Sequence, residues 1–267
     1  MRRYASCGFL FPFEENWIMN NRATVVGLGE VLWDVFPDRK VLGGAPANFA
    51  YHMSQLGYDA CVLSAVGDDL FGEEIIASLK ETHLDFLIET TDFPTGIVQV
   101  DLDNYGVPQY AIAENVAWDN IPFTVRIEAL AKVTQVVSFG SLVQRTEVGR
   151  DTVRKFLCRM PKNSLKIFDI NLRQNYYSEA LILNSLELAN VLKINEEELS
   201  IVSKLFSYDN TEEQGVCRYL MEEFDLQIVI LTKGLAGSFV FTESEISFQP
   251  TPKVQVVDTV GAGDSFT

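Results

Sequence analysis

The sequence predicts an α/β protein built as a three-layer αβα sandwich around a mostly parallel central sheet. Short apolar runs of strand length alternate with amphipathic stretches of helical length along most of the chain. That alternation is typical of a parallel sheet covered by helices on both faces. The 267 residues suffice for one large domain with a substantial core. Ligands of such sheets bind beyond the carboxyl ends of the strands, so functional residues are expected there.

The individual elements follow from the periodicity. The first strand is predicted at residues 24–29 (TVVGLG), an apolar run that ends in glycine. Further strands are predicted at 60–66, 135–139, 165–170, 191–194 and 227–231, and helices at 44–56, 69–80, 147–160 and 212–224. In the helix at 44–56, Phe49, Met53 and Leu56 fall on one face, which is the pattern of a helix packed on a core.

Two segments break this alternation. Residues 96–113 (GIVQVDLDNYGVPQYAIA) alternate apolar and polar side chains around a turn at Gly106, which indicates a hairpin. Residues 30–36 (EVLWDVF) alternate in the same way, and neither segment is followed by a helix as a βαβ unit requires. We expect the two segments, near 30–36 and 96–115, to form a small β layer that covers the site as a lid. The alternative is an edge hairpin without function.

Composition and charge narrow the classes of partner. The formal net charge is -16, which argues against nucleic acid as a partner. An anionic nucleotide remains compatible with this charge, because backbone N–H groups, a few cations and a metal suffice to bind phosphate. No apolar run approaches the ~20 residues of a membrane span. The four cysteines are far apart in sequence, so we expect free thiols and a cytoplasmic protein.

The two ends of the chain call for separate expectations. Residues 1–22 are expected to be an N-terminal extension outside the core, because Met19 is a second plausible start that leads directly into the first strand. Residues 23–267 are expected to form the domain itself. The chain ends three residues after Asp264, so a helix beginning there would be a stub too short to sustain itself. The domain is therefore expected to be C-terminally incomplete, either as a fragment or as an impaired protein.

The strongest chemical pattern is VVDTVGAGDSFT at residues 256–267. The small residues Gly261, Ala262 and Gly263 follow a strand-like run and let the backbone approach a ligand closely. If a helix begins here, its free N–H groups would stabilise negative charge on a transferring phosphoryl group. Asp264 could accept the proton of an attacking hydroxyl. The alternative is a plain strand-to-helix turn.

A second pattern is VLGGAPANFAYH at residues 41–52. Gly43 and Gly44 allow close approach of the backbone, and the Asn48 amide both donates and accepts hydrogen bonds. Upstream, the carboxylate of Asp34 can accept two hydroxyl protons. This set of groups suits a sugar, whereas the alternative is a plain helix start with a solvated asparagine.

These two patterns, in this order and more than 200 residues apart, resemble the signatures of the PfkB (ribokinase-like) family of carbohydrate kinases. The resemblance runs from about residue 24 to residue 267, and GEVLWDVFPDRKVLGGAPANFAYH is most similar to the bacterial fructokinases. It implies a ribokinase-like fold and ATP-dependent phosphorylation of a sugar primary hydroxyl, with fructose converted to fructose 6-phosphate. It also implies Mg²⁺ and a homodimer formed through the lid.

The resemblance assigns further residues. Asn195 and Glu198 match the family's NxxE motif, which helps to organise Mg²⁺ and the phosphates. The resemblance implies an indirect role for Glu198 at the metal. The alternative is an ordinary helix cap. Thr232, Gly234 and Gly237 resemble the family's nucleotide-binding turn, whose alternative is a simple turn between strands. This turn is not a P-loop, since GxxxxGK[ST] is absent.

Other assignments rest on weaker patterns. Arg173 ends a DxNxR stretch and would lie near the sugar or the transferred phosphate, the alternative being a surface ion pair. Asp258 would help to hold a monovalent cation such as K⁺, as in some family members. Glu114 and Asn115 end the hairpin, where lid closure would bring them to the substrate.

Other functions stay open. No basic cluster for a phosphorylated substrate is evident in the sequence, which favours an unphosphorylated sugar. Ribose, 2-keto-3-deoxygluconate and adenosine are the alternative substrates. A catalytically weak sugar-binding or regulatory protein is the alternative outside the kinase class.

Overall fold

The computed structural model describes residues 23–102, 108–208, 212–252, 263 and 266–267. The strands of the larger sheet are β1 (Thr24–Leu28), β4 (Asp59–Gly67), β5 (Asp85–Thr91), β8 (Val136–Gly140), β9 (Leu165–Asp169), β10 (Val191–Asn195), β11 (Ile228–Thr232), β12 (Ser238–Thr242) and β13 (Ile246–Gln249). They are arranged in the order β13-β12-β11-β10-β9-β8-β1-β4-β5. Neighbouring strands from β5 to β11 are parallel, whereas β12 and β13 pair antiparallel. The predicted mostly parallel sheet is confirmed.

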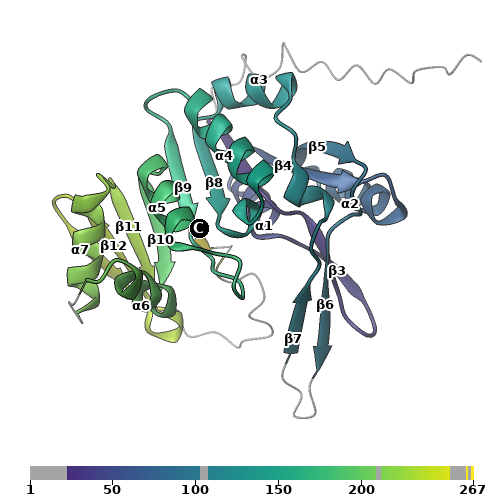
Figure 1. The fold of residues 1–267 in the computed structure, drawn as a ribbon. Helices are drawn as coiled ribbons and strands as arrows, with labels where there is room; N and C mark the ends of the chain where they lie inside the picture. The colour runs from purple at the N-terminus through teal and green to yellow at the C-terminus, as the bar shows by residue number, and fades with distance from the viewer. Residues whose placement is uncertain (1–22, 103–107, 209–211, 253–262, 264–265) are drawn as a thin grey trace, which may run out of the picture.

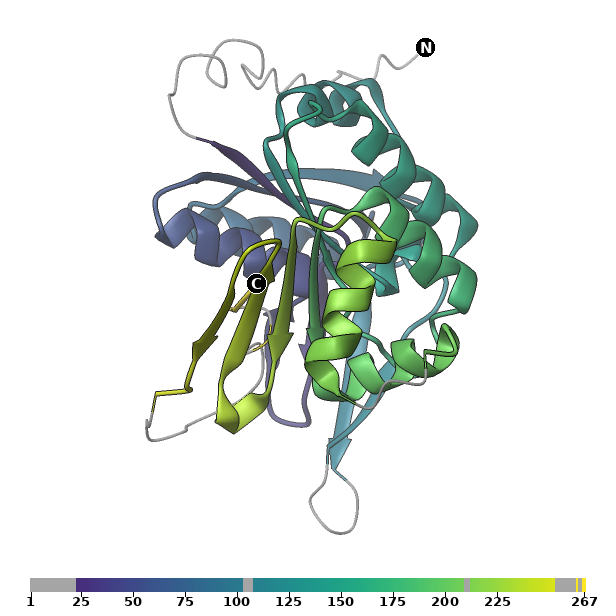
Figure 2. The ribbon, with the colours of Figure 1, turned by 90° about the vertical axis from the view of Figure 1, so that its left-hand side faces the viewer.

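Helices cover both faces of this sheet (Figure 2). They are α1 (Ala45–Gln55), α2 (Leu70–Glu81), α3 (Val125–Val133), α4 (Glu147–Arg159), α5 (Glu179–Leu188), α6 (Glu196–Leu205) and α7 (Glu213–Glu223), with short 3-10 turns η1 (Ala117–Asn120), η2 (Leu142–Gln144) and η3 (Gly234–Ala236). Side chains of α1 and α2 belong to one apolar core, and those of α3 to α7 belong to another. The three-layer αβα sandwich is thus confirmed.

Strand β1 shows why both faces are apolar. Val25 lies in the core beneath α1 and α2, whereas Val26 lies in the core beneath α3 to α7, and both are fully buried. Successive strand residues point to opposite faces, so a strand covered on both sides reads as a continuous apolar run. The predicted strands and helices match the observed ones to within one or two residues at most ends.

A second, four-stranded sheet stands apart from the first (Figure 1). Its strands are β2 (Leu32–Val35), β3 (Lys40–Gly43), β6 (Ile97–Leu102) and β7 (Pro108–Ile112), in the order β3-β2-β6-β7. β6 and β7 form the predicted antiparallel hairpin, and β2 joins it by parallel pairing with β6. The predicted β layer outside the main sheet is therefore present, and we call it the small sheet.

The small sheet is anchored to α2 on one side. The indole N–H of Trp33 donates to the carbonyl oxygen of Phe71 over 3.1 Å. The Lys40 ammonium lies 4.8 Å from the ring centres of both Trp33 and Phe71, and it forms an ion pair with Glu74. These contacts join strands β2 and β3 to the first turns of α2.

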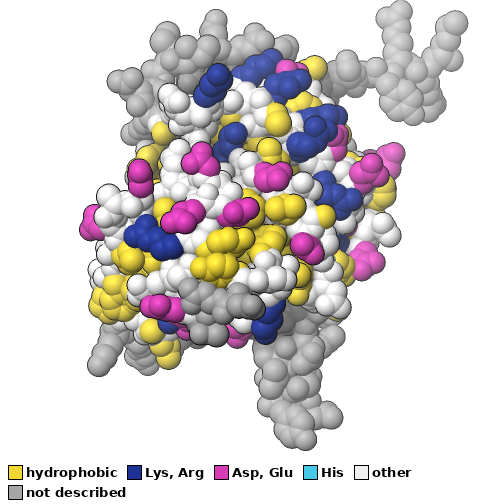
Figure 3. Space-filling view, turned by 60° about the vertical axis from the view of Figure 1, so that its left-hand side comes forward, with side chains coloured by type: hydrophobic (Ala, Val, Ile, Leu, Met, Phe, Trp, Pro, Cys, Tyr) yellow, Lys and Arg dark blue, Asp and Glu magenta, His cyan; other side chains and the backbone are white. Residues whose placement is uncertain are grey.

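The face shown in Figure 3 carries charges of both signs. Lysines and arginines gather over α3 and α4, where Asp151 pairs with Arg154 and Lys155 and where Glu128 pairs with Lys132 and Arg159. Within the described ranges, no helix is long and apolar enough to cross a membrane. The expected N-terminal extension, residues 1–22, lies outside the described residues.

Candidate functional site

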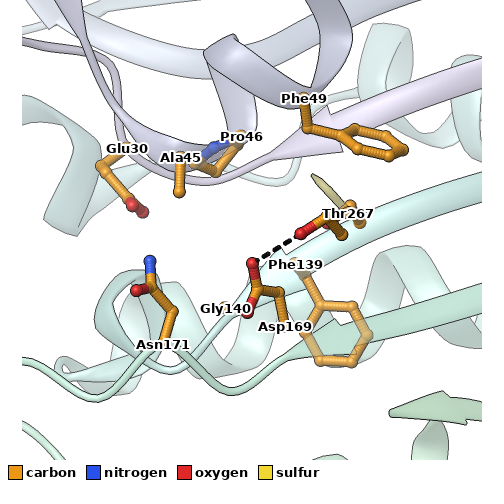
Figure 4. A pocket seen from close by; sticks show the side chains of 10 residues that line it. Glu30, Ala45, Pro46, Phe49, Phe139, Gly140, Asp169, Asn171 and Thr267 are labelled. Carbon is orange, nitrogen blue, oxygen red and sulfur yellow. Dashed lines mark hydrogen bonds between the residues drawn. The ribbon is translucent and has the colours of Figure 1, made fainter. Parts of the chain in front are cut away.

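A small pocket lies at the carboxyl ends of β8 and β9, beneath the start of α1 (Figure 4). Its lining residues are Glu30, Ala45, Pro46, Phe49, Ser138, Phe139, Gly140, Asp169, Asn171 and Thr267. The side chains of Glu30 and Asn171 face one another across it. This is the edge of the sheet where the parallel topology places ligands.

One lining residue, Asp169, belongs to a buried ion pair. The Lys193 ammonium on β10 donates to both carboxylate oxygens of Asp169 on β9, over 2.9 and 3.0 Å. The two side chains are 7% and 6% exposed. The Thr267 hydroxyl donates to the same carboxylate over 3.0 Å. An acidic and a basic group are therefore held together beside the pocket.

The residues predicted to bind the sugar lie where the small sheet meets α1. Asp34 on β2 lies against Gly43 on β3, so closely that a Cβ atom on Gly43 would be 2.3 Å from an Asp34 carboxylate oxygen. Gly44 precedes α1 with φ of 115°, and its carbonyl accepts the Asn48 backbone N–H over 3.0 Å. The structure thus brings these four predicted residues together, beside the pocket-lining Ala45.

The predicted NxxE residues form a reciprocal cap at the start of α6. The Asn195 side chain accepts the Glu198 N–H over 2.9 Å, and a Glu198 oxygen accepts the Asn195 N–H over 3.0 Å. The other Glu198 oxygen accepts the Leu172 N–H over 2.9 Å. Burial raises the pKa of the Glu198 carboxyl group, although these hydrogen bonds oppose the shift. This geometry is the capping box that the alternative interpretation requires, and it also links α6 to the segment after β9.

The predicted nucleotide-binding turn follows β11. Thr232 ends the strand, and Gly234 and Gly237 have φ of 49° and 135°, values that favour glycine. Lys233 within the turn forms ion pairs with Glu213 and Glu196 over 2.5 and 3.3 Å. The hydrogen bond to Glu213 is the main cause of the raised pKa of Lys233. The turn is therefore fixed to the first turns of α6 and α7.

The glycine-rich signature is described only in part. Gly261, Ala262, Asp264 and Asp258 lie outside the described residues. Gly263 is described, and a Cβ atom on it would lie 3.5 Å from the Lys193 ammonium. The Thr267 hydroxyl contacts the Gly263 carbonyl oxygen over 3.2 Å as well as Asp169. Two residues of the signature thus lie at the buried ion pair.

Arg173 lies on the segment that follows β9 and is exposed. No residue in the described part of the chain forms an ion pair with it. The alternative interpretation of Arg173, a surface ion pair, therefore has no partner among the described residues.

Of the two residues predicted at the end of the hairpin, Glu114 belongs to a cluster whose other members, around Arg145, the sequence did not predict. Arg145 forms a buried ion pair with Asp119 over 2.6 Å, and its guanidinium lies 4.2 Å from the Trp118 ring centre and 4.7 Å from that of Tyr176. The Tyr176 hydroxyl donates to Glu114 over 2.7 Å. That hydrogen bond, followed by burial, raises the pKa of Tyr176, so the hydroxyl stays protonated as a donor at neutral pH.

The donor set bears on the predicted Mg²⁺. Among the described residues, no group of three or more His, Cys, Asp or Glu side chains could hold a metal ion alone. Mg²⁺ is commonly held by one or two carboxylates together with substrate phosphates, and Asp169 and Glu198 provide two carboxylates near the pocket. Both Glu198 oxygens already accept backbone N–H groups, which fits an indirect role better than direct ligation.

Sequence reasoning missed four residues of this site: Glu30, Asp169, Asn171 and Lys193. Asp169 and Asn171 stand in the DxNxR stretch, from which only Arg173 was chosen, so that signal was present. Lys193 lies inside an apolar strand and gave no signal, because its partner is on a different strand.

Comparison with known proteins gives consistent matches over nearly the whole chain. Residues 18–267 match the family described as pfkB family carbohydrate kinase. A sugar kinase of Pyrococcus horikoshii is 31% identical over 243 residues, which cover 88% of this chain and 74% of that protein. A fructokinase of Klebsiella pneumoniae is 29% identical over 261 residues, covering 93% and 82%.

Solved structures agree with the sequence matches. The Pyrococcus horikoshii sugar kinase in complex with ATP has a TM-score of 0.76 and 28% identity, covering 91% of this chain and 81% of that one. A fructokinase of Vibrio cholerae, solved with fructose, ADP and calcium ion, has a TM-score of 0.77 at 24% identity, covering 92% and 82%. At that identity the second comparison shows the fold alone.

Proposed function

The chain belongs to the pfkB family of carbohydrate kinases, and we propose that within this family it transfers the γ-phosphoryl group of ATP to the primary hydroxyl of fructose, giving fructose 6-phosphate. The observation that carries the proposal is the meeting of two distant signatures at one pocket. Ala45, beside Gly44, lines the same pocket as Thr267, the last residue of the glycine-rich signature. Sugar-binding and phosphoryl-transfer residues must meet in this way for an in-line transfer.

In this proposal the sugar lies between the small sheet and the carboxyl ends of β8 and β9. The Asp34 carboxylate accepts hydrogen bonds from the sugar hydroxyls, and the Asn48 amide both accepts and donates them. The facing side chains of Glu30 and Asn171 are further candidates. Asp264 takes the proton from the attacking primary hydroxyl. The backbone N–H groups of residues 261–263 stabilise the negative charge that develops on the transferred group.

ATP occupies the carboxyl ends of the neighbouring strands, with its phosphates near Gly234 and Gly237. The ATP complex of the Pyrococcus horikoshii relative supports this use of the nucleotide. A Mg²⁺ ion bound with ATP would be held chiefly by the phosphates, with Glu198 acting through bound water, and would offset phosphate charge. The small sheet excludes water, which would otherwise compete as the phosphoryl acceptor.

The choice of an unphosphorylated sugar rests on the charges around the pocket. Lys193 is paired with Asp169 and Arg145 with Asp119, so each of these cations is already neutralised. The exposed Arg173 is the remaining described cation on the segment bordering the pocket. A single exposed arginine is a modest counter-charge for a phosphorylated sugar, and the Klebsiella pneumoniae fructokinase supports fructose.

A coupled assay of ADP release tests the function. The chain is incubated with ATP and Mg²⁺ and with fructose, ribose, 2-keto-3-deoxygluconate or adenosine in turn. We expect turnover with fructose and at least about tenfold lower kcat/KM with the others. Greater kcat/KM with another sugar would reject fructose but keep the kinase. Sugar binding by calorimetry without turnover on any substrate would favour the sugar-binding alternative.

Substitution of the proposed base tests the mechanism. Asp264→Asn should lower kcat by at least ~10²-fold, the scale expected for loss of a positioned base, while the sugar Kd changes little. A variant with near-normal turnover would exclude Asp264 as the base.

A further inference from the structure

The segment between β9 and α5, residues 170–178, has no regular secondary structure but is held in place at several points. The Leu172 N–H donates to Glu198, and the Ser141 hydroxyl donates to the Asn171 carbonyl oxygen over 3.4 Å. Asn171 and Gln174 have φ of 40° and 47°. Non-glycine residues adopt such values at some energetic cost and keep them where the surroundings impose them. We call this segment the connecting segment.

One end of the connecting segment reaches the nucleotide side of the site. Leu172 is bound to Glu198, which in turn accepts the N–H of Asn195. Asn195 pairs with Thr232 across strands β10 and β11. A shift of Leu172 would therefore disturb the group of residues to which the proposed function assigns the phosphates and the metal.

The other end reaches the small sheet. Tyr176 donates its hydroxyl proton to Glu114, two residues beyond the end of β7. The Ala113 N–H donates to the Ile97 carbonyl oxygen, so this stretch of chain moves with the sheet. The Tyr176 ring is packed beneath Arg145. Glu114 and Tyr176 are 62 positions apart in sequence, and their hydrogen bond bridges the small sheet and the connecting segment.

We propose that Tyr176 is a positioning residue that couples sugar binding to nucleotide binding. Its hydrogen bond to Glu114 transmits the position of the small sheet, through the connecting segment, to Glu198. The inference rests on the proposed function, since it requires a sugar under the small sheet and a nucleotide near Glu198. Asn171, in the middle of the connecting segment, lines the pocket between them. Coupling of this kind is reciprocal: each ligand must tighten the other by the same factor.

The measurement is the sugar Kd by isothermal titration calorimetry, with and without a non-hydrolysable ATP analogue and Mg²⁺. The sugar is the one that supports turnover in the ADP-release assay. We expect the analogue to tighten sugar binding to the unaltered protein by about fivefold or more, the usual lower range for coupled sites. In Tyr176→Phe the sugar Kd with the analogue should differ by no more than about twofold from the Kd without it, while the Kd without the analogue changes little from that of the unaltered protein.

Two matched controls separate positioning from a general structural effect. Tyr177→Phe removes the neighbouring hydroxyl, which has no hydrogen-bond partner among the described residues, and should keep the full coupling. Glu114→Gln keeps an oxygen that can accept the Tyr176 proton and should keep most of the coupling. Glu114→Ala removes the acceptor, and its coupling factor should fall as in Tyr176→Phe.

The outcomes are distinct. Loss of coupling in Tyr176→Phe and Glu114→Ala, with both controls intact, supports the inference. Three results overturn the inference and leave the kinase proposal standing. The first is unchanged coupling in Tyr176→Phe, and the second is an unaltered protein whose sugar Kd is the same with and without the analogue. The third is a Tyr176→Phe variant whose sugar binding is weakened equally with and without the analogue. If the unaltered protein turns over none of the sugars and binds neither ligand, the proposed function fails and the inference fails with it.

Discussion

The buried ion pair beneath the pocket gives the sharpest test of the structure. Lys193→Met removes the charge and keeps a side chain of similar length. Asp169 would then remain as a carboxylate that is 6% exposed and has lost a cation contacting both of its oxygens. Breaking a buried pair in this way costs about 3–5 kcal/mol, a large part of the 5–15 kcal/mol by which folded proteins are typically stable.

The assay is urea unfolding at equilibrium, followed by circular dichroism. Lys132→Met is the matched control, because its ion pair with Glu128 joins side chains that are 59% and 32% exposed; its removal should cost about 0.5 kcal/mol or less. The double variant Asp169→Asn/Lys193→Met removes both charges. Its loss in the free energy of unfolding should be smaller than the sum of the losses in the two single variants, by an interaction energy of about 2–3 kcal/mol.

A free energy of unfolding for Lys193→Met within about 1 kcal/mol of that of the unaltered protein would contradict this account, since the pair would then contribute no more than a surface pair.

Two further substitutions test a glycine at the start of α1 and the cap of α2. Gly44→Ala places a Cβ atom 2.3 Å from the Glu30 carbonyl oxygen at a φ of 115°, and it should lower the free energy of unfolding in urea by about 1–3 kcal/mol. Gly57→Ala is the control, because it has a φ of 88° and no atom within 4 Å, and it should lower the free energy by less. Equal losses in the two variants would contradict the close contact at Gly44. Asp69→Asn weakens the carboxylate that caps α2 and accepts the Thr95 N–H and hydroxyl over 2.8 and 2.7 Å. Burial tends to raise the pKa of Asp69, but these hydrogen bonds outweigh it and the pKa lies below the ordinary 3.8. The stabilisation by Asp69 is therefore present above pH 3.8 and disappears as the pH falls through the lowered pKa. Asp69→Asn should lower the free energy of unfolding by about 1–2 kcal/mol at neutral pH and by less in acid. A difference between variant and unaltered protein that does not change with pH would contradict this origin.

The sequence by itself determined the layers of the fold. Apolar runs such as residues 24–28 predict strands that are buried on both faces, and the break in rhythm at residues 96–113 predicts a hairpin outside the main sheet. These patterns are local, because they reflect the period of a strand or helix and which of its faces are covered. The glycine-rich motifs are also local patterns, because only small residues let the backbone come close to a ligand or to another segment.

Only the tertiary structure decided which side chains meet. Asp169 and Lys193 are paired because β9 and β10 are neighbours in one register, and Tyr176 meets Glu114 because the small sheet returns beside the connecting segment. Less regular strands such as β5 and β13 also escaped prediction: β5 mixes apolar and polar residues, and β13 is exposed throughout. Contacts between residues far apart in sequence depend on strand order and register, and neither leaves a periodic trace in the chain.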